Sequence, residues 1–257
     1  MLLAIDIGNT NLVLGVFEGD QLKHSWRVAT RRDETADEYA LLCRNLFELA
    51  GLSHSRLEGI VICSVVPPLN EAFETMCNVY FGVDPFFVEP AQQDLMPIRY
   101  TPVSDVGADR IVTAVAAFRK LEDSAIVVDF GTATTFDAIS KEGEYLGGII
   151  APGLDISAEA LYSRAARLPR IEIQKPPGVI GTSTVESMQS GLYYGYLGLV
   201  DGILGQMRRE LKEAKVIATG GLAPLVAGET DRIHCVEEHL TLSGLEIFYR
   251  HLQQKRR

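Results

Sequence analysis

The chain of 257 residues carries a formal net charge of −10, with 34 acidic against 24 basic side chains, and 47% of its residues are hydrophobic. This length and composition are typical of a globular protein with one large domain or two ordinary ones. The acidic balance argues against a nucleic-acid partner, and no apolar run reaches the roughly 18–20 residues of a membrane span. With no visible signal peptide and four cysteines lacking CxxC spacing, we expect a cytoplasmic protein with free thiols and no membrane partner.

The first half is expected to form a strand meander followed by alternating helices and strands. Apolar runs broken by Gly, Pro and charged turns mark each element. The elements, in chain order, are strands at about residues 2–7, 12–18 and 21–29, a helix at 35–51, a strand at 59–66, a helix at 69–80, a short strand at 85–89 and a helix at 111–120. Glu18-Gly19-Asp20 supplies a hairpin turn, and Pro67-Pro68 stops the fourth strand.

The second half repeats this order. Its elements are strands at about 124–130, 134–140 and 144–150, helices at 153–165 and 184–211, a strand at 214–219, a helix at 222–227, a strand at 233–236 and a final helix from 241. The repetition predicts a duplicated α/β protein. We place the boundary near residue 120, which gives domains of residues 1–120 and 121–257. Because no low-complexity linker separates the halves, we expect them to pack closely around an interdomain cleft.

One motif occurs in both halves: a buried strand, an Asp at its carboxyl end, a Gly/Thr turn and a second strand. The copies are Asp6-Ile7-Gly8-Asn9-Thr10-Asn11, which runs into Leu12 and Val13, and Asp129-Phe130-Gly131-Thr132-Ala133-Thr134-Thr135. Gly lets backbone N–H groups approach an anion, Thr and Asn add neutral donors, and Asp can hold a cation or its waters. Either copy alone is compatible with a polar turn, but the pair predicts two phosphate-binding hairpins in a nucleotide-dependent phosphotransferase. Without GxxxxGK[ST] or the combined HRD and DFG set, P-loop and protein-kinase sites are excluded.

Gly107-Ala108-Asp109-Arg110 precedes the helical run that starts at Ile111. One interpretation is a helix start with a favourable acidic residue. The other places Asp109 in the cleft as a general base that takes the proton of an acceptor hydroxyl, with Arg110 orienting substrate or neutralising charge. Since none of the seven lysines lies in these motifs, we expect positive charge to come from backbone N–H groups, Arg110 and metal ions.

Further glycine-rich segments accompany the hairpins. Gly220-Gly221 lies between a strand and a helix, where a tight turn and a helix N-terminus can meet the nucleotide. Gly147-Gly148 and Ala151-Pro152-Gly153 follow the third strand of the second half. Glycine there serves either a tight turn or a substrate lying against bare backbone, and both interpretations stay open.

The helix predicted at 184–211 carries glycines at three- and four-residue spacing, which places most of them on one face. They are Gly191, Gly195, Gly198, Gly202 and Gly205. Another helix can approach such a face closely, either within the chain or across a self-complementary dimer. Gly181-Thr182-Ser183-Thr184 precedes this helix and offers good N-cap residues.

These motifs resemble those of the type III pantothenate kinases, in the superfamily of acetate and sugar kinases, Hsp70 and actin. The resemblance covers the whole chain. Its markers are the two acidic hairpins, the Gly107–Arg110 element, Gly147-Gly148 with Ala151-Pro152-Gly153, and Ala218-Thr219-Gly220-Gly221. The first hairpin is shared across the superfamily, whereas the GxDR element and the short DFGTATT form are more specific. The resemblance implies two actin-like (ribonuclease H-like) α/β domains, each a mixed sheet flanked by helices, with an interdomain cleft.

The implied activity is ATP-dependent phosphorylation of pantothenate to 4′-phosphopantothenate, the first step of coenzyme A biosynthesis, in a homodimer. The residues implied to bind ATP are Asp6, Ile7, Gly8, Asn9, Thr10, Asn11, Leu12, Val13 and Thr132, with Gly220 and Gly221 on the adenosine side. Those implied to bind pantothenate are Tyr100, Gly107, Ala108, Asp109, Arg110 and Thr184, and Asp109 is also the implied proton acceptor. Asp129 is implied to bind a monovalent cation (K⁺ or NH₄⁺), and Mg²⁺ accompanies the nucleotide near Asp6, directly or through water.

Two other functions remain open at this point. Another small-molecule kinase of the superfamily, acting on a sugar or a carboxylate, would carry the same hairpins. A catalytically inactive nucleotide-binding regulator would tolerate the loss of a carboxylate, yet Asp6, Asp109 and Asp129 are all present. One local departure from the family pattern is Thr101, which stands before Pro102 where an Asn is expected.

Overall fold

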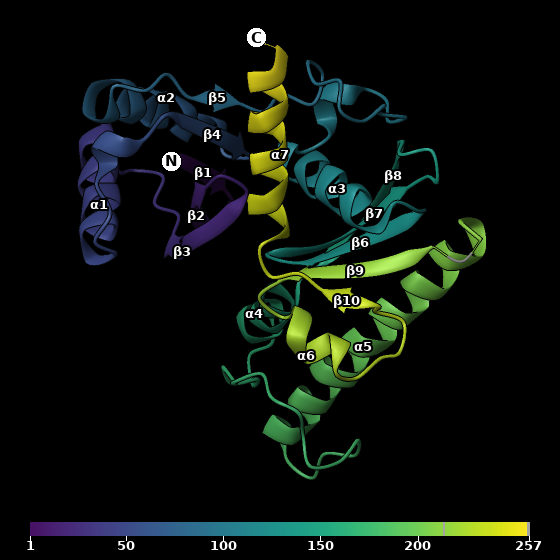
Figure 1. Cartoon of the computed structure of the whole chain (residues 1–257). Coiled ribbons are helices and arrows are strands. Elements are labelled where there is room, and N and C mark those ends of the chain that lie inside the picture. Colours follow the sequence, from purple (N-terminus) through teal and green to yellow (C-terminus); the bar gives the residue numbers. More distant parts are fainter. Residues whose placement is uncertain (213, 256–257) are drawn as a thin grey trace. The chain divides into compact units, whose positions relative to one another are not determined.

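The computed structural model describes residues 1–212 and 214–255 (Figure 1). The chain divides into two compact units, each built on its own five-stranded sheet. The first unit holds Met1–Arg119 together with the described residues from His239 onward, and the second holds Lys120–Glu238. The chain therefore leaves the first unit near residue 120 and returns to it with its last helix.

The sheet of the first unit has the strand order β3-β2-β1-β4-β5. Its strands are β1 (Leu2–Ile7), β2 (Asn11–Glu18), β3 (Gln21–Ala29), β4 (Gly59–Ser64) and β5 (Phe86–Phe87). Strand β1 pairs antiparallel with β2 and parallel with β4, so it lies at the centre of the sheet. Its continuous apolar sequence fits a strand that is covered on both faces.

Helices cover both faces of this sheet. They are α1 (Ala36–Leu49), α2 (Pro67–Met76), a π-helical turn (Cys77–Phe81), α3 (Ala108–Leu121) and α7 (Leu240–Lys255), with 3-10 turns at His54–Arg56 and Val103–Asp105. Helix α1 begins at a capping box in which the side chains of Thr35 and Glu38 each accept the other residue's backbone N–H. Its Tyr39 and Phe47 pack in one buried core with alternate strand residues such as Ile5.

Helix α7 packs on β1, β2 and β4, which changes the domain limits expected from the sequence. Gly244 lies against the Val112 carbonyl, and the Tyr249 ring covers Gly59. A Cβ at Gly244 or Gly59 would lie 2.1 or 2.0 Å from these neighbours, so only glycine permits the contact. The second domain is therefore shorter than 121–257 by its last helix, because the apolar face of that helix is covered by the first sheet.

The second unit repeats the topology of the first. Its sheet order is β10-β9-β6-β7-β8, with an antiparallel meander from β6 to β8 and a parallel neighbour at β9. The elements are β6 (Ala125–Phe130), β7 (Ala133–Ile139), β8 (Tyr145–Pro152), α4 (Leu154–Arg164), α5 (Thr184–Glu210), β9 (Lys215–Gly220), α6 (Ala223–Ala227) and β10 (Cys235–Val236). The predicted duplicated α/β fold of two mixed sheets flanked by helices is confirmed.

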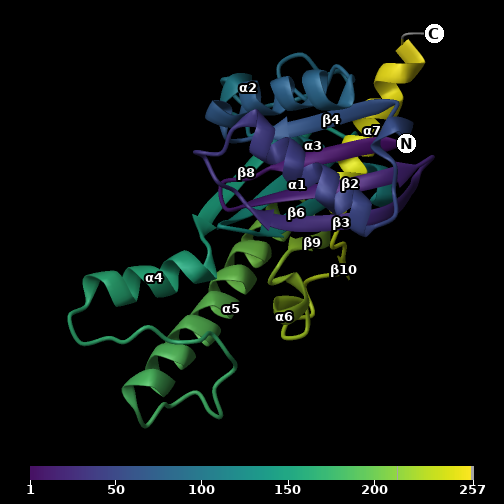
Figure 2. The same ribbon diagram turned by 90° about the vertical axis from the view of Figure 1, so that its left-hand side faces the viewer.

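Helix α5 starts at Thr184, directly after its N-cap residue Ser183, as the sequence predicts. The Ser183 hydroxyl accepts the backbone N–H of Glu186 at 3.2 Å, which satisfies a donor of the first turn. The C-terminal half of α5 packs on the sheet of its own unit, whereas its N-terminal end extends away from that sheet beside α4 (Figure 2). Among the described residues no helix is long and apolar enough to cross a membrane.

Candidate active site

The turn between β1 and β2 is the first predicted phosphate hairpin. The Gly8 N–H donates to the Asn11 carbonyl at 3.0 Å, and a Cβ on Gly8 would lie 2.8 Å from that oxygen. Asn9 and Thr10 are exposed at the tip of the turn. Ile7 and Leu12 are buried and paired with each other across the two strands. Within the predicted residues 6–13, the turn therefore exposes polar groups that can bind a ligand. The apolar residues on either side of the turn hold the two strands together.

Thr30 follows β3 and stabilises this turn with two hydrogen bonds. Its hydroxyl donates to the Gly8 carbonyl at 2.6 Å and its backbone N–H donates to the Thr10 carbonyl at 2.9 Å. Both bonds hold carbonyl groups of the turn, and this fixes its conformation. Thr30 was not among the residues predicted from the sequence, although a hydroxyl residue at the end of a strand next to the hairpin strands was a signal.

Asp6 lies at the carboxyl end of β1, beside Cys63 on β4. The Cys63 thiol donates to Asp6 Oδ1 at 3.3 Å. Burial raises the pKa of Cys63 well above its usual value, and the nearby carboxylates of Asp6 and Asp109 raise it further. The contact between Cys63 and Asp6 joins β4 to the end of β1, and sequence spacing did not reveal it. As predicted, this cysteine is buried and has a free thiol.

Asp109 lies in the first turn of α3, which starts at Ala108 and not at the predicted Ile111. The Arg110 N–H donates to Asp109 Oδ1 at 2.8 Å, and a Cβ on Gly107 would lie 2.4 Å from that oxygen. Burial raises the pKa of Asp109, while the Arg110 N–H and guanidinium oppose this shift. A partly buried carboxylate with a raised pKa is a suitable proton acceptor.

Three other residues of the predicted pantothenate pocket, Ala108, Arg110 and Tyr100, also belong to the first unit. Ala108 and Arg110 are buried in the first turn of α3. The Thr113 hydroxyl lies 3.0 Å from both the Asp109 and Arg110 carbonyl oxygens, so it braces that turn. Tyr100 is half-buried in the segment between β5 and α3, and its role stays a prediction.

The second hairpin lies at the carboxyl ends of β6 and β9. Asp129 pairs with Thr219 across these parallel strands, and Gly220 follows with a φ of +89°. A Cβ on Gly220 would lie 2.6 Å from Asp129 Oδ1 and from the Phe130 carbonyl oxygen. Thr132 is exposed in the neighbouring turn. The structure therefore brings Gly220, predicted to contact the nucleotide, against Asp129, predicted to bind a monovalent cation, and Thr132 lies in the turn that follows Asp129.

Two other glycines of this unit differ in their surroundings. A Cβ on Gly153 would lie 2.2 Å from the Thr132 carbonyl oxygen, so this glycine lets the chain pack tightly against the second hairpin. Of the two interpretations given for this segment, the contact favours the tight turn for Gly153, because the chain itself fills the space where a substrate would lie. A Cβ on Gly221 meets nothing within 4 Å, and its predicted nucleotide contact remains a prediction.

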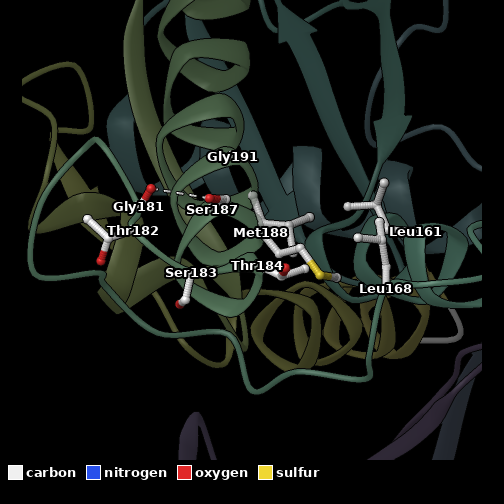
Figure 3. Close-up of a pocket in the computed structure, with 10 residues that line it drawn as sticks. Leu161, Leu168, Gly181, Thr182, Ser183, Thr184, Ser187, Met188 and Gly191 are labelled. Carbon is white, nitrogen blue, oxygen red and sulfur yellow. Dashed lines mark hydrogen bonds between the residues drawn. The ribbon is translucent and has the colours of Figure 1, made fainter.

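Thr184 begins α5 and lines a pocket of about 740 Å³ in the second unit. Figure 3 shows Thr184 and Met188 facing Leu161 and Leu168, while the Ser187 hydroxyl donates to the Gly181 carbonyl at 3.4 Å. The pocket lies at the end of α5 that extends away from the second sheet (Figure 2). Thr184 is exposed there.

The donor chemistry of the two hairpins fits oxygen-loving cations. Within residues 1–212 and 214–255, no three His, Cys, Asp or Glu side chains gather into a metal-binding group. Mg²⁺ in phosphotransferases needs no such cage, since one or two carboxylates, waters and substrate phosphates complete its coordination. Single carboxylates at the strand ends, Asp6 and Asp129, suit that arrangement.

Two sheets of equal topology, each with an acidic glycine hairpin at the end of a strand, define an actin-like fold. A ROK family glucokinase from Streptomyces griseus, solved with glucose and AMPPNP, shares this fold. It has a TM-score of 0.56 over 97% of this chain and 99% of that one, at 13% identity.

The family within this fold class follows from sequence comparison. The profile of the type III pantothenate kinases matches residues 2–206. Type III pantothenate kinases of Syntrophotalea carbinolica and Anaeromyxobacter dehalogenans are 54% and 56% identical over 97% of this chain and 98% of theirs. The chain belongs to the type III pantothenate kinase family. The resemblance recognised from its motifs is thereby confirmed, as is its assignment as a pantothenate kinase.

Proposed function

We propose that this chain transfers the γ-phosphoryl group of ATP to the primary hydroxyl of pantothenate and so forms 4′-phosphopantothenate. The observation that carries this proposal is Asp109, a half-buried carboxylate with a raised pKa in the first turn of α3, whose Oδ1 accepts the Arg110 N–H at 2.8 Å. A phosphate-binding hairpin and a proton acceptor in one unit are what a kinase acting on an alcohol needs. The use of ATP supports the expectation of a cytoplasmic enzyme.

The first hairpin would bind the terminal phosphates through its backbone N–H groups and the exposed Asn9 and Thr10 side chains. Thr132, in the second predicted phosphate-binding hairpin, would also hold ATP, and the Gly220-Gly221 turn would bind the adenosine side. Asp109 would accept the hydroxyl proton as the oxygen attacks, and Arg110 would balance charge beside it. Because charge on the transferred phosphoryl is stabilised by groups already in place, removing one such donor costs about 3 kcal/mol of transition-state stabilisation.

Asp6 would hold Mg²⁺, directly or through water, and Asp129 would hold K⁺ or NH₄⁺. When bound, these cations neutralise the phosphates in a chain whose net charge is −10. Tyr100 and the Gly107–Arg110 turn would line the pantothenate pocket. Backbone N–H groups and neutral Thr side chains suit the pantothenate carboxylate, because both can donate hydrogen bonds to an anion.

We also propose a homodimer in which Thr184 serves the partner subunit's site. The glycine face of α5 supports this. A Cβ on Gly191, Gly195, Gly198 or Gly202 meets nothing within 4 Å in its own chain, so the glycines leave room for a second helix. Val179 and Ile180 are 65% and 88% exposed, and they add apolar surface just before the N-terminal end of α5.

The dimer predicts a sedimenting mass about twice that of the 28.2 kDa chain. Gly198→Glu should convert it to a monomer, because a charged side chain would occupy the space that the second helix needs. Analytical ultracentrifugation measures the mass of the native chain and of the Gly198→Glu variant. Leu49→Glu, at a position of α1 that is 84% exposed, is the control and should stay dimeric. A monomeric native chain would contradict the proposal.

The activity itself is tested by ATP consumption with pantothenate, acetate and hexoses, each with Mg²⁺ and with K⁺ or Na⁺. Of these acceptors, we expect only pantothenate to be phosphorylated. Its turnover should be faster with K⁺ than with Na⁺. Turnover only with a sugar or a carboxylate would favour the alternative small-molecule kinase. Nucleotide binding without turnover on any substrate would favour the inactive regulator.

A further inference from the structure

Arg32 places a guanidinium on the first hairpin. Its Nη2 donates to Asn9 Oδ1 at 2.8 Å, and the side chain is exposed. The two residues are far apart in the sequence and come from different segments, since Asn9 is in the turn after β1 and Arg32 follows β3. Arg32 lies outside the motifs that predicted the site from the sequence.

The segment that carries Arg32 is fixed to the turn. Thr30, two residues earlier, bonds the carbonyls of Gly8 and Thr10 through its hydroxyl and its N–H, at 2.6 and 2.9 Å. Three hydrogen bonds therefore join residues 30–32 to residues 8–10. A side chain held in this way loses less rotational freedom when it binds a ligand, which favours binding.

Charge makes this position significant. The chain has a net charge of −10, and no lysine lies in the hairpin. The neighbouring Arg31 is engaged elsewhere, because its Nε lies 3.5 Å from Glu34 Oε1. Its carbonyl also accepts the Tyr39 hydroxyl at 2.5 Å. Of these two adjacent arginines, Arg32 is the one whose guanidinium contacts the hairpin.

We propose that Arg32 is a phosphate-binding residue of the nucleotide site, contacting the terminal phosphates that the hairpin holds. This rests on the proposed function of the first hairpin. An Arg side chain has five N–H donors in a planar fork, and the bond to Asn9 uses one. The others match phosphate oxygens in geometry and charge. Arg32 then supplies the fixed positive charge that the hairpin motif itself lacks.

A simpler role would be that Arg32 only holds the Asn9 side chain. The two roles differ in what they discriminate. A residue that only supports the turn acts through its hydrogen bond to Asn9, so an uncharged donor can replace it. A residue that binds phosphate acts through its positive charge, so Lys replaces it better than Gln does, and its loss reduces the salt dependence of ATP binding.

The experiment compares Arg32→Gln, Arg32→Lys and Arg31→Gln by calorimetric titration with ATP, ADP and adenosine at low and moderate salt. For Arg32→Gln we expect about 10- to 100-fold weaker ATP binding, unchanged adenosine binding and a weaker salt dependence. Arg32→Lys should lie between this variant and the native chain. Arg31→Gln, the matched control, should bind ATP like the native chain, and melting temperatures should show that all variants fold.

Two results would overturn the inference. One is ATP binding by Arg32→Gln equal to that of Arg31→Gln. The other is equal ATP affinity of Arg32→Gln and Arg32→Lys with the salt dependence of the native chain, which would leave only the supporting role. Failure of the proposed function is recognised separately, because the native chain would then bind ATP no better than adenosine.

Discussion

Asp109→Asn is expected to lower kcat by about 10²- to 10⁴-fold while the affinity for ATP stays within about twofold. The amide keeps the shape of the carboxyl group, but it cannot accept the proton of the pantothenate hydroxyl. Asp109 Oδ1 contacts the Arg110 N–H at 2.8 Å, and an Asn oxygen can accept the same bond. Single-turnover kinetics with calorimetric ATP titration separate the two effects.

The same substitution should raise stability at neutral pH. Burial raises the folded-state pKa of Asp109 above its unfolded value. The folded protein therefore holds this proton at pH values where the unfolded chain has lost it, and stability falls as pH rises through that window. We expect Asp109→Asn to melt at a higher temperature than the native chain at pH 7.5, with the difference shrinking as the pH falls through the raised pKa. In the native chain, turnover should fall in the same acidic window as Asp109 becomes protonated.

Asp105→Asn is the matched control for both measurements. Asp105 is an exposed carboxylate on the 3-10 turn just before α3. Its replacement should change neither kcat nor the pH dependence of melting. Turnover that survives Asp109→Asn would remove the proton-acceptor role from this residue.

Gly220→Ala is expected to destabilise the second unit by about 2–4 kcal/mol and to abolish nucleotide binding there. The residue has a φ of +89°, which L side chains rarely adopt, and its new methyl group would lie 2.6 Å from Asp129 Oδ1 and the Phe130 carbonyl. Strain and overpacking each cost about 1–3 kcal/mol. Differential scanning calorimetry should show a fall in melting temperature of roughly 5–10 °C.

The neighbouring glycine separates the structural effect from the binding effect. Gly221 has open space where a methyl group would go, so Gly221→Ala should melt like the native chain. If Gly221 contacts the nucleotide as predicted, this variant weakens ATP binding without loss of stability. Equal melting temperatures for Gly220→Ala and the native chain would contradict the close packing of Gly220 on Asp129.

Local sequence patterns predicted most elements to within a few residues. The hairpin at residues 6–11 and the strand that ends at Asp129 were recognisable because a buried strand, an acid and a glycine turn follow one another directly. The start of α3 was predicted three residues late, since Asp109 and Arg110 were interpreted as preceding the helix. Asp109 instead occupies its first turn, where an acidic side chain is favoured.

Contacts between distant segments could not be predicted in this way. The Cys63 thiol reaches Asp6 because β4 pairs in register with β1, and the register is not written in either strand alone. The contact of Arg32 with Asn9 likewise depends on the path of β3 beside β2. Helix α7 was assigned to the wrong half because its amphipathic pattern does not specify which sheet it covers.

The return of α7 to the first sheet has a consequence for biosynthesis on the ribosome. The second unit is an insertion, complete in Lys120–Glu238, whereas the first needs both ends of the polypeptide. A nascent chain can thus close its inner unit while β1 still awaits the helix that carries Gly244 and Tyr249. Premature termination near residue 238 would leave one face of that sheet bare, so a truncated product is a substrate for chaperones and proteases.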